Sequence, residues 1–221
     1  MIPPILHRIW LGRRPLPRAA RLYARRWSEL HPRWEMRLWT DQNLPAIENA
    51  DAFSAADSYA EKADILRYEL LRDHGGVYVD CDFEPLRPLD DLVLALPAFA
   101  GQQDDELIAI GIMGSSAHHP LFEHLVATLP HRVARFQGVP VAMRTGPHFF
   151  TDVLQDWNLR KDCVIFDRGL FYPYHYTELH RSRERFPEAY AVHHWANSWG
   201  RGGTIRARAS RSARALLRTW R

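Results

Sequence analysis

A short hydrophobic strand that ends in two aspartates constrains this chain more than any other feature. Residues 77–80 (Val-Tyr-Val-Asp) are rich in β-branched and aromatic side chains, and Cys81 and Asp82 follow directly. Side chains two positions apart in an extended chain project to the same side, roughly 6.5–7 Å apart at Cα. We therefore predict a strand whose end presents the carboxylates of Asp80 and Asp82 together.

Two carboxylates placed where a strand gives way to a loop can share one hard divalent cation. Mg²⁺ or Mn²⁺ held in this way keeps coordination positions open for substrate phosphates. The cation would neutralise charge that builds on a departing diphosphate. An Asp-x-Asp pair without further context is more often a solvated loop start, so the surrounding sequence has to decide between the two interpretations.

The stretch before this strand predicts a helix over residues 58–73. Gly75 supplies a left-handed stop just past its end. Asp64 and Arg67 are three positions apart and therefore lie on one face of the helix. They form either an exposed intrahelical ion pair, which contributes little, or part of the site at Asp80.

The rest of the chain reads as one α/β domain of 221 residues. A strand over 5–10, a helix over 17–30 and a strand over 34–39 predict a right-handed crossover, with Leu22, Trp27 and Leu30 facing inward. Further elements are a strand over 107–113, a helix over 120–129, a turn leading into a helix over 145–151, and a late strand over 190–195.

Charge and cysteine content exclude several classes of protein. The chain carries +3 overall, and residues 201–221 contain seven Arg and no acid, which leaves −4 for residues 1–200. A mildly acidic body argues against nucleic-acid binding. Two cysteines, Cys81 and Cys163, form neither a disulfide framework nor a zinc site of the usual kind.

The basic tail, residues 204–221, predicts an amphipathic helix. Five arginines fall on one side of a helical plot, and Leu216, Leu217 and Trp220 fall on the other. Such a helix either sits on anionic lipid or packs on the body with a solvated Arg face. The start of the chain has no signal-peptide pattern and no stretch is apolar enough to span a membrane. We expect a cytoplasmic protein, soluble or peripheral on the inner face of the membrane.

Taken together, these segments resemble the glycosyltransferases that share a sugar-binding region with an Asp-x-Asp (DXD) motif. That family includes yeast-type initiating mannosyltransferases, α-1,4-galactosyltransferases and bacterial polysaccharide enzymes; the glucosylating toxins of clostridia are more distant. The usual Asn before the block at Ser115 is replaced by Ile110-Gly111. The matching blocks, in order over residues 2–199, are 2–12, 32–41, 64–82 with Pro-Leu at 85–86 and 88–89, 119–122, 145–147 and 193–199.

The resemblance implies a GT-A fold over residues 1–203, a Rossmann-like nucleotide-sugar-binding α/β fold with a mixed central sheet. It implies transfer of a hexose from a nucleotide-diphosphate sugar to a glycan or lipid-linked acceptor, with a divalent metal and with retention of anomeric configuration. By position, Asp64 and Arg67 would hold the sugar and phosphates of the donor. Asp82 would be the principal metal ligand, and Asp80 would contact ribose or the metal through water.

Further roles carried over from the resemblance concern the nucleoside and the diphosphate. Ile9 and Trp10 would line the nucleoside pocket, with Tyr78 nearby. Ser198 and Trp199 would cap the diphosphate.

A polar residue near the C-terminus completes the metal shell in this family, and His193 is the best match. Adjacent residues of a strand face opposite ways, so only one of His193 and His194 can be the ligand. Imidazole favours Mn²⁺ over Mg²⁺. Asn197 and Ser198 would give supporting contacts, and without a metal His193 would be an ordinary buried histidine.

Two other functions fit parts of the pattern. Haloacid-dehalogenase-like phosphohydrolases also place Asp-x-Asp after a strand, but near the N-terminus, with Thr or Val next and a downstream lysine. Here Phe83-Glu84 follows the motif and Lys161 is the only later lysine. A non-catalytic nucleotide-sugar-binding protein would be expected to have lost one of the candidate site residues, all of which are intact.

Overall fold

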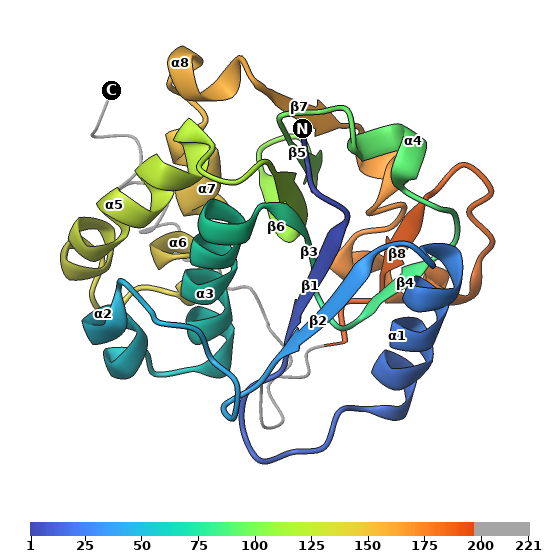
Figure 1. The fold of residues 1–221 in the computed structure, drawn as a ribbon, viewed down its shortest axis with the longest axis horizontal. Coiled ribbons are helices and arrows are strands. Elements are labelled where there is room, and N and C mark those ends of the chain that lie inside the picture. Colours follow the sequence, from blue (N-terminus) through green and yellow to red (C-terminus); the bar gives the residue numbers. More distant parts are fainter. Residues whose placement is uncertain (197–221) are drawn as a thin grey trace.

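The computed structural model describes residues 1–196 as a mixed six-stranded sheet with helices on both faces (Figure 1). β1 is parallel to β2 and β3, β6 is antiparallel to β3 and β5, and β7 is parallel to β5. The strand order is β2 (Glu35–Trp39), β1 (Ile5–Ile9), β3 (Gly76–Val79), β6 (Ile108–Ser115), β5 (Ala98–Gln102) and β7 (Cys163–Phe166). The predicted mixed α/β architecture is confirmed.

A second, two-stranded sheet lies beside the first and pairs β4 (Phe83–Pro85) with β8 (Ala191–His193) in antiparallel register. Figure 1 shows this pair on the same side of the large sheet as α1 (Arg18–Leu30). The opposite side carries α2 (Ala50–Ala55), α3 (Tyr59–His74), α5 (Pro120–Arg135), α6 (Val141–Arg144) and α7 (Pro147–Val153). The remaining elements are α4 (Asp90–Val93), α8 (Trp157–Arg160) and the 3₁₀ helices η1 (Arg168–Leu170) and η2 (Tyr176–Arg183).

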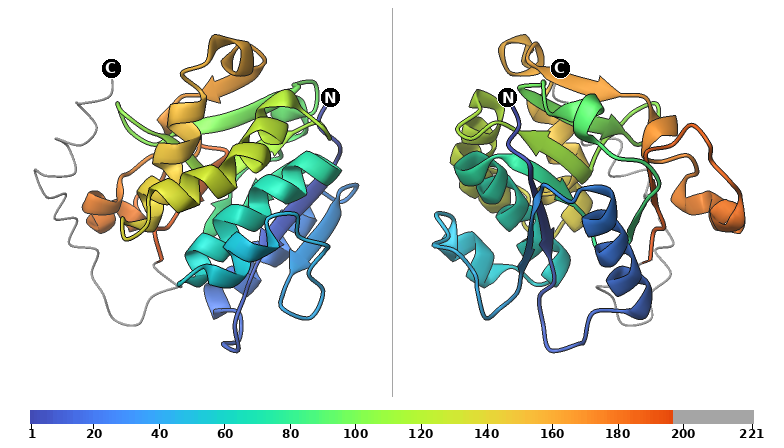
Figure 2. Two further views of the ribbon diagram at one scale, coloured as in Figure 1. Left: turned by 90° about the vertical axis from the view of Figure 1, so that its left-hand side faces the viewer. Right: turned by 45° about the vertical axis from the view of Figure 1, so that its right-hand side comes forward.

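Alternate residues of the strands divide most of the core into two large clusters, one on each face of the sheet, and two smaller clusters lie beside them. Tyr78 packs in the cluster with α3 and α5, whereas Val77 and Val79 pack in the cluster with Trp27 of α1. The side chains of β3 are therefore buried on both faces of the sheet, as expected for a central strand. Figure 2 (left) shows α3 and α5 side by side over their face.

The predicted β1–α1–β2 crossover is present, but the prediction that Leu22 faces inward is wrong. Leu22 is 55% exposed, whereas Trp27 is 1% exposed and donates its indole N–H to the Phe83 carbonyl at 3.2 Å. α1 therefore packs on β4 along the line through Ala20 and Trp27. Leu22 is two residues from Ala20, about 200° around the helix, and so faces solvent.

Helix α3 leads into the strand that carries the aspartates. The Ser58 hydroxyl accepts from the Glu61 N–H at 3.2 Å and caps the start of the helix. Gly75 ends it at φ 62°, in the left-handed region that favours glycine. A Cβ at Gly75 would lie 2.6 Å from the Ala117 nitrogen, so no larger residue fits there. Among residues 1–196, no helix is long and apolar enough to cross a bilayer.

Two buried histidines help to fix β1 and α1, and both are neutral. His7 accepts from the Trp39 indole N–H at Nδ1 (3.1 Å) and donates from Nε2 to the Gly75 carbonyl (2.9 Å). Burial lowers its pKa to about 4. His31 accepts from the Leu89 N–H at 2.9 Å, and burial lowers its pKa as well.

We expect the free energy of unfolding to fall as the pH drops from 6.5 towards 4. His7 binds a proton at its ordinary pKa in the unfolded chain but only near pH 4 in the folded one. The difference amounts to as much as about 3 kcal/mol at the acid end of this window. Urea unfolding between pH 7 and pH 5 measures it.

His7→Gln should flatten part of this pH dependence, because glutamine does not titrate. His31 contributes with the same sign, so some slope remains. The matched control is His124→Gln, on the exposed side of α5, which should leave the slope as it is. Equal slopes for wild type and His7→Gln would contradict the assignment.

Candidate active site

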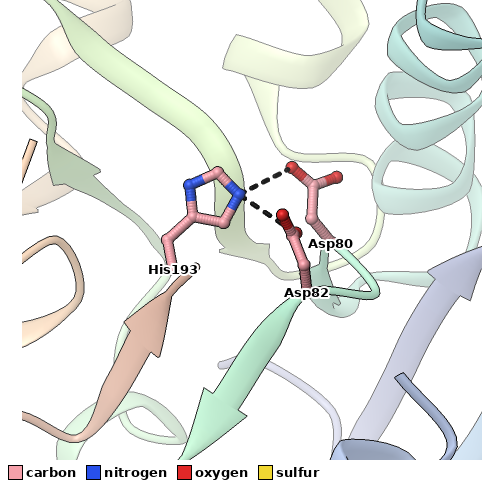
Figure 3. Close-up of side chains that lie close together, drawn as sticks. All are labelled: Asp80, Asp82 and His193. Atoms are coloured by element: carbon pink, nitrogen blue, oxygen red, sulfur yellow. Dashed lines mark hydrogen bonds and ion pairs between the residues drawn. The ribbon is translucent and has the colours of Figure 1, made fainter. Parts of the chain in front are cut away.

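The pairing of β4 with β8 brings His193 to the two aspartates (Figure 3). Asp80 follows β3 and donates its N–H to the Gly111 carbonyl at 2.8 Å, and the chain then turns through Cys81 and Asp82 into β4. Phe83 lies opposite His193 in the register of the small sheet, with the two rings stacked 4.7 Å apart. Residues more than 100 positions apart in sequence therefore meet at one point.

Asp80, Asp82 and His193 each turn one potential ligand atom into a common space. The three atoms lie within 4.8 Å of one another. His193 Nε2 is 3.1 Å from Asp82 Oδ1 and 3.8 Å from Asp80 Oδ2. Two carboxylates and an imidazole at this spacing form a set that fits a divalent cation such as Mn²⁺.

The charges in this cluster are strongly coupled. Burial alone would raise the pKa of Asp82, but the charge and hydrogen bond of His193 outweigh it and lower the pKa to about 2. Burial raises the pKa of Asp80, and the neighbouring Asp82 raises it further. Burial would lower the pKa of His193, but both aspartates together raise it. The cluster therefore has one carboxylate that stays ionised over almost the whole pH range.

His194 faces away from the aspartates. Its Nε2 is 2.9 Å from Glu84 Oε2, its Nδ1 is 3.1 Å from the Tyr174 hydroxyl, and its ring stacks on Tyr23. Of the two adjacent histidines, the structure thus places His193 at the aspartates. The backbone beyond it also closes on Asp82, since the Ala196 N–H donates to Asp82 Oδ2 at 2.8 Å.

Asp64 and Arg67 lie in the interior next to this cluster, so the alternative of an exposed ion pair is wrong. Asp64 is 6% exposed and Arg67 is 4% exposed. Arg67 Nη2 is 3.1 Å from Asp64 Oδ1 and 3.3 Å from Asp80 Oδ1. One guanidinium therefore links the helix α3 carboxylate to the first aspartate of the motif.

Every nitrogen of the Arg67 guanidinium has a partner in the protein. Nε donates to the Ala63 carbonyl at 3.2 Å and Nη1 to the Ile110 carbonyl at 2.8 Å. The group also lies over the Tyr78 ring, 4.4 Å from its centre. The Tyr78 hydroxyl in turn donates to Asp80 Oδ1 at 2.6 Å. Tyr78 is thus part of the site, through Asp80 and Arg67.

Two further residues that received no role from the sequence support the site. The Thr145 hydroxyl donates to Asp64 Oδ2 at 2.9 Å, and burial raises the pKa of Asp64 to about 7 against the opposing effects of Arg67 and Thr145. A Cβ at Gly111 would lie 2.8 Å from Asp80 Oδ2. The segment that departs from the usual family pattern therefore contacts the site through its backbone.

The two candidate nucleoside residues lie beside the loop that carries the aspartates. Ile9 is 1% exposed, and its carbonyl accepts from the Cys81 thiol at 3.3 Å. Trp10 is 7% exposed, packs with Cys81, and donates its indole N–H to the Arg14 carbonyl at 2.7 Å. Asn197, Ser198, Trp199 and the tail 204–221 lie outside the described residues.

Comparison with known proteins agrees with this geometry. Residues 17–97 match the family described as "Glycosyltransferase sugar-binding region containing DXD motif". Inositol phosphoceramide mannosyltransferase 3 of Schizosaccharomyces pombe is 28% identical over 88% of this chain and 60% of its own length. The chain spans about half the length of the curated relatives it matches, including 44% and 46% of two others.

Solved glycosyltransferases share the fold. The PaToxG glycosyltransferase superposes with a TM-score of 0.59 and 16% identity, over 71% of this chain and 70% of that one. The UDP-bound glycosyltransferase domain of the YGT toxin gives 0.54 and 10% identity, over 75% and 79%. The family match and the named mannosyltransferase relatives argue against the phosphohydrolase alternative. Residues 17–97, which include Asp80 and Asp82, thus match the DXD-containing sugar-binding region of glycosyltransferases, and the chain has the GT-A fold of the solved glycosyltransferases.

Proposed function

We propose that this protein transfers a hexose from a nucleotide-diphosphate sugar to a glycan or lipid-linked acceptor, with retention of anomeric configuration and with a bound divalent metal. The observation that carries the proposal is the convergence of Asp80, Asp82 and His193 within 4.8 Å. Retention is inferred from the family resemblance.

The donor set supports Mn²⁺, with Mg²⁺ as the alternative, because it combines two carboxylates with an imidazole. Asp82 and His193 would hold the cation directly, with Asp80 as the third ligand or as a partner through water. Bound there, a divalent cation would supply Lewis-acid stabilisation of the departing diphosphate. Tyr78 and Arg67 support this role because both fix the orientation of Asp80.

In this proposal Arg67 does not contact the donor itself but holds Asp64 and Asp80 in position. All three of its nitrogens are engaged by Asp64, Asp80 and two backbone carbonyls, which favours a positioning role over a direct grip on the phosphates. Asp64, held by Arg67 and Thr145, is the carboxylate that would accept hydrogen bonds from hydroxyls of the donor sugar. Ile9, Trp10, Ser198 and Trp199 remain the proposed contacts to the nucleoside and the diphosphate.

The relatives suggest which sugar and acceptor to test first. The Schizosaccharomyces pombe relative is named for a mannosyl group and an inositol phosphoceramide. We extend the chemical class to this chain: mannose as the sugar and a lipid-linked polyol as the acceptor. Contact of the basic segment 204–221 with anionic lipid would suit such an acceptor.

Nucleotide binding should depend on a divalent cation. Titration calorimetry with GDP and with UDP should show at least about ten-fold tighter binding of one of them in Mn²⁺ than in excess chelator, because Asp82 and His193 would hold a cation that attracts the diphosphate. Turnover of GDP-mannose, UDP-glucose and UDP-galactose then identifies the donor.

Two outcomes would count against the proposal. Equal nucleotide affinity with Mn²⁺ and with chelator would contradict the proposed metal dependence. Metal-dependent binding without hydrolysis or transfer of any donor would favour the non-catalytic nucleotide-sugar-binding protein.

A further inference from the structure

Three partly exposed aromatic side chains next to His193 pack against one another edge to face or tilted, and we call this cluster the aromatic platform: His175, Tyr176 and Trp195. The Trp195 ring is 4.2 Å from the His193 ring, 5.7 Å from Tyr176 and 6.0 Å from His175. Tyr176 is 36% exposed. The platform therefore begins one ring away from the histidine of the candidate metal cluster.

The backbone of Trp195 is held in an unusual conformation. Its φ of 53° lies in the left-handed region, which a bulky side chain rarely adopts. The indole N–H donates to the Tyr174 carbonyl at 3.0 Å, and the ring contacts buried Tyr172. Conformations of this kind persist where the surrounding structure enforces them, often at functional sites. The orientation of the ring is thus set by the fold before a ligand arrives.

Polar groups lie at the edge of the platform. His175 Nε2 is 3.8 Å from Asp104 Oδ2, and these side chains are 20% and 29% exposed. Asp104 is fixed in the loop between β5 and β6, where its other oxygen accepts from the N–H groups of Glu106 and Leu107. An aromatic face bordered by a carboxylate and an imidazole suits a ring with an apolar C–H face and hydroxyls around its rim.

The platform lies across the aspartates from the side chains that reach Asp80 out of α3 and β3. Arg67 of α3 and Tyr78 of β3 contact Asp80. His193 reaches the two aspartates from β8 (Figure 3). Figure 2 (right) shows the segment before β8, drawn in orange, as a lobe at the edge of the molecule on this side. An acceptor hydroxyl has to approach the donor sugar, which under the proposed function lies at these aspartates, and the platform begins one ring from His193.

We propose that His175, Tyr176 and Trp195 form an acceptor subsite that stacks a polyhydroxylated six-membered ring. The assignment rests on the proposed function, since it places the acceptor at the same site. The ring can be a pyranose of a glycan or a cyclitol such as inositol, and both present a C–H face with hydroxyls around it. Asp104 and His175 bind hydroxyls at the edge of the stacked ring.

Saturation-transfer NMR tests the subsite without requiring turnover. Methyl α-D-mannopyranoside and myo-inositol serve as the two ring probes, each with Mg²⁺ and the nucleoside diphosphate that binds best. Wild-type protein should transfer saturation to the ring C–H protons of one probe, and the probe that responds identifies the acceptor class. Tyr176→Ala should reduce that transfer by about five- to ten-fold, the effect of removing one ring contact.

Controls separate this subsite from the donor site and from folding. Tyr176 is exposed, so the variant should fold, whereas Trp195→Leu gives supporting data only where it folds. Leu179→Ala is the matched control, because Leu179 is an exposed apolar residue of the same segment η2, at 50% exposure. It should leave saturation transfer unchanged.

The outcomes are distinguishable. Transfer that is equal in wild type and Tyr176→Ala, or absent for both probes in the wild type, would overturn the subsite. Weaker nucleotide binding by Tyr176→Ala would assign the platform to the donor instead. Lack of metal-dependent nucleotide binding in the wild type would defeat the proposed function, and would do so independently of the ring-binding result.

Discussion

Replacing Asp82 by asparagine should lower kcat/KM for hexose transfer by about 10³-fold or more. The carboxylate lies 3.1 Å from His193 Nε2, and the charge and hydrogen bond of His193 lower its pKa to about 2, so this proposed metal ligand stays negative at every working pH. Asparagine keeps the shape and can still accept from the Ala196 N–H. It cannot supply the negative oxygen that a hard cation prefers. Initial rates across a Mn²⁺ titration measure the effect.

The loss of activity should greatly exceed the loss of stability. Because the folded-state pKa of Asp82 is lowered, its charge stabilises the native state above pH 4 and this contribution fades as the pH falls towards 2. Neutralising it should therefore cost only about 2 kcal/mol of unfolding free energy. The matched control is Asp91→Asn, on the exposed side of α4, which should change neither quantity. Full activity of the wild-type protein in excess chelator would contradict the proposed metal site.

Local sequence signals predicted four of the six strands of the large sheet, namely β1, β2, β3 and β6, and missed the other two. β1, α1, β2, α3 and β3 have clear periodicity, and glycine marks the end of α3. β5 (Ala98–Gln102) and β7 (Cys163–Phe166) were not predicted. They are short, β5 carries alanine and glycine, and its register with β6 shifts between Ala100 and Gly101. Such strands are specified by pairing with distant segments, which no local pattern encodes.

The same distinction applies to the site. The neighbouring positions of Asp80 and Asp82 follow from strand geometry alone. His193 came from the family resemblance, because only the pairing of β4 with β8 brings it near. For α3 the spacing predicted an inward face but not burial on nearly every side, between the sheet, α2 and α5. Because α3 is buried in this way, Arg67 lies in the interior, where its ion pairs with Asp64 and Asp80 contribute to stability.

Arg67→Met should lower the free energy of unfolding by about 3–5 kcal/mol, the usual cost of removing one partner from a buried ion pair. Asp64 and Asp80 would each lose their guanidinium partner inside the protein, and the Ala63 and Ile110 carbonyls would lose a donor. The neighbouring carboxylates raise the pKa of Arg67 despite its burial, so its charge persists and stabilises the native state. Urea unfolding at pH 7 measures the loss.

Arg67→Lys should recover little of this stability and little activity. A single ammonium cannot reach two carboxylates and two carbonyls in the directions of a planar guanidinium. Arg25→Met provides the comparison on the surface. Arg25 pairs with Glu29 on the exposed face of α1, with 78% of its side chain accessible, so the free energy of unfolding should stay close to that of the wild type.

The two possible roles of Arg67 differ in what the lysine variant retains. If Arg67 positions Asp64 and Asp80, stability and metal-dependent nucleotide binding should fall together in both variants, because Asp80 loses its orientation with its partner. If Arg67 instead served mainly to grip the donor phosphates, Arg67→Lys would unfold at wild-type urea concentrations and lose only nucleotide affinity. That second result would contradict the positioning role, and the hydrogen bonds to Ala63 and Ile110 would then contribute little to stability.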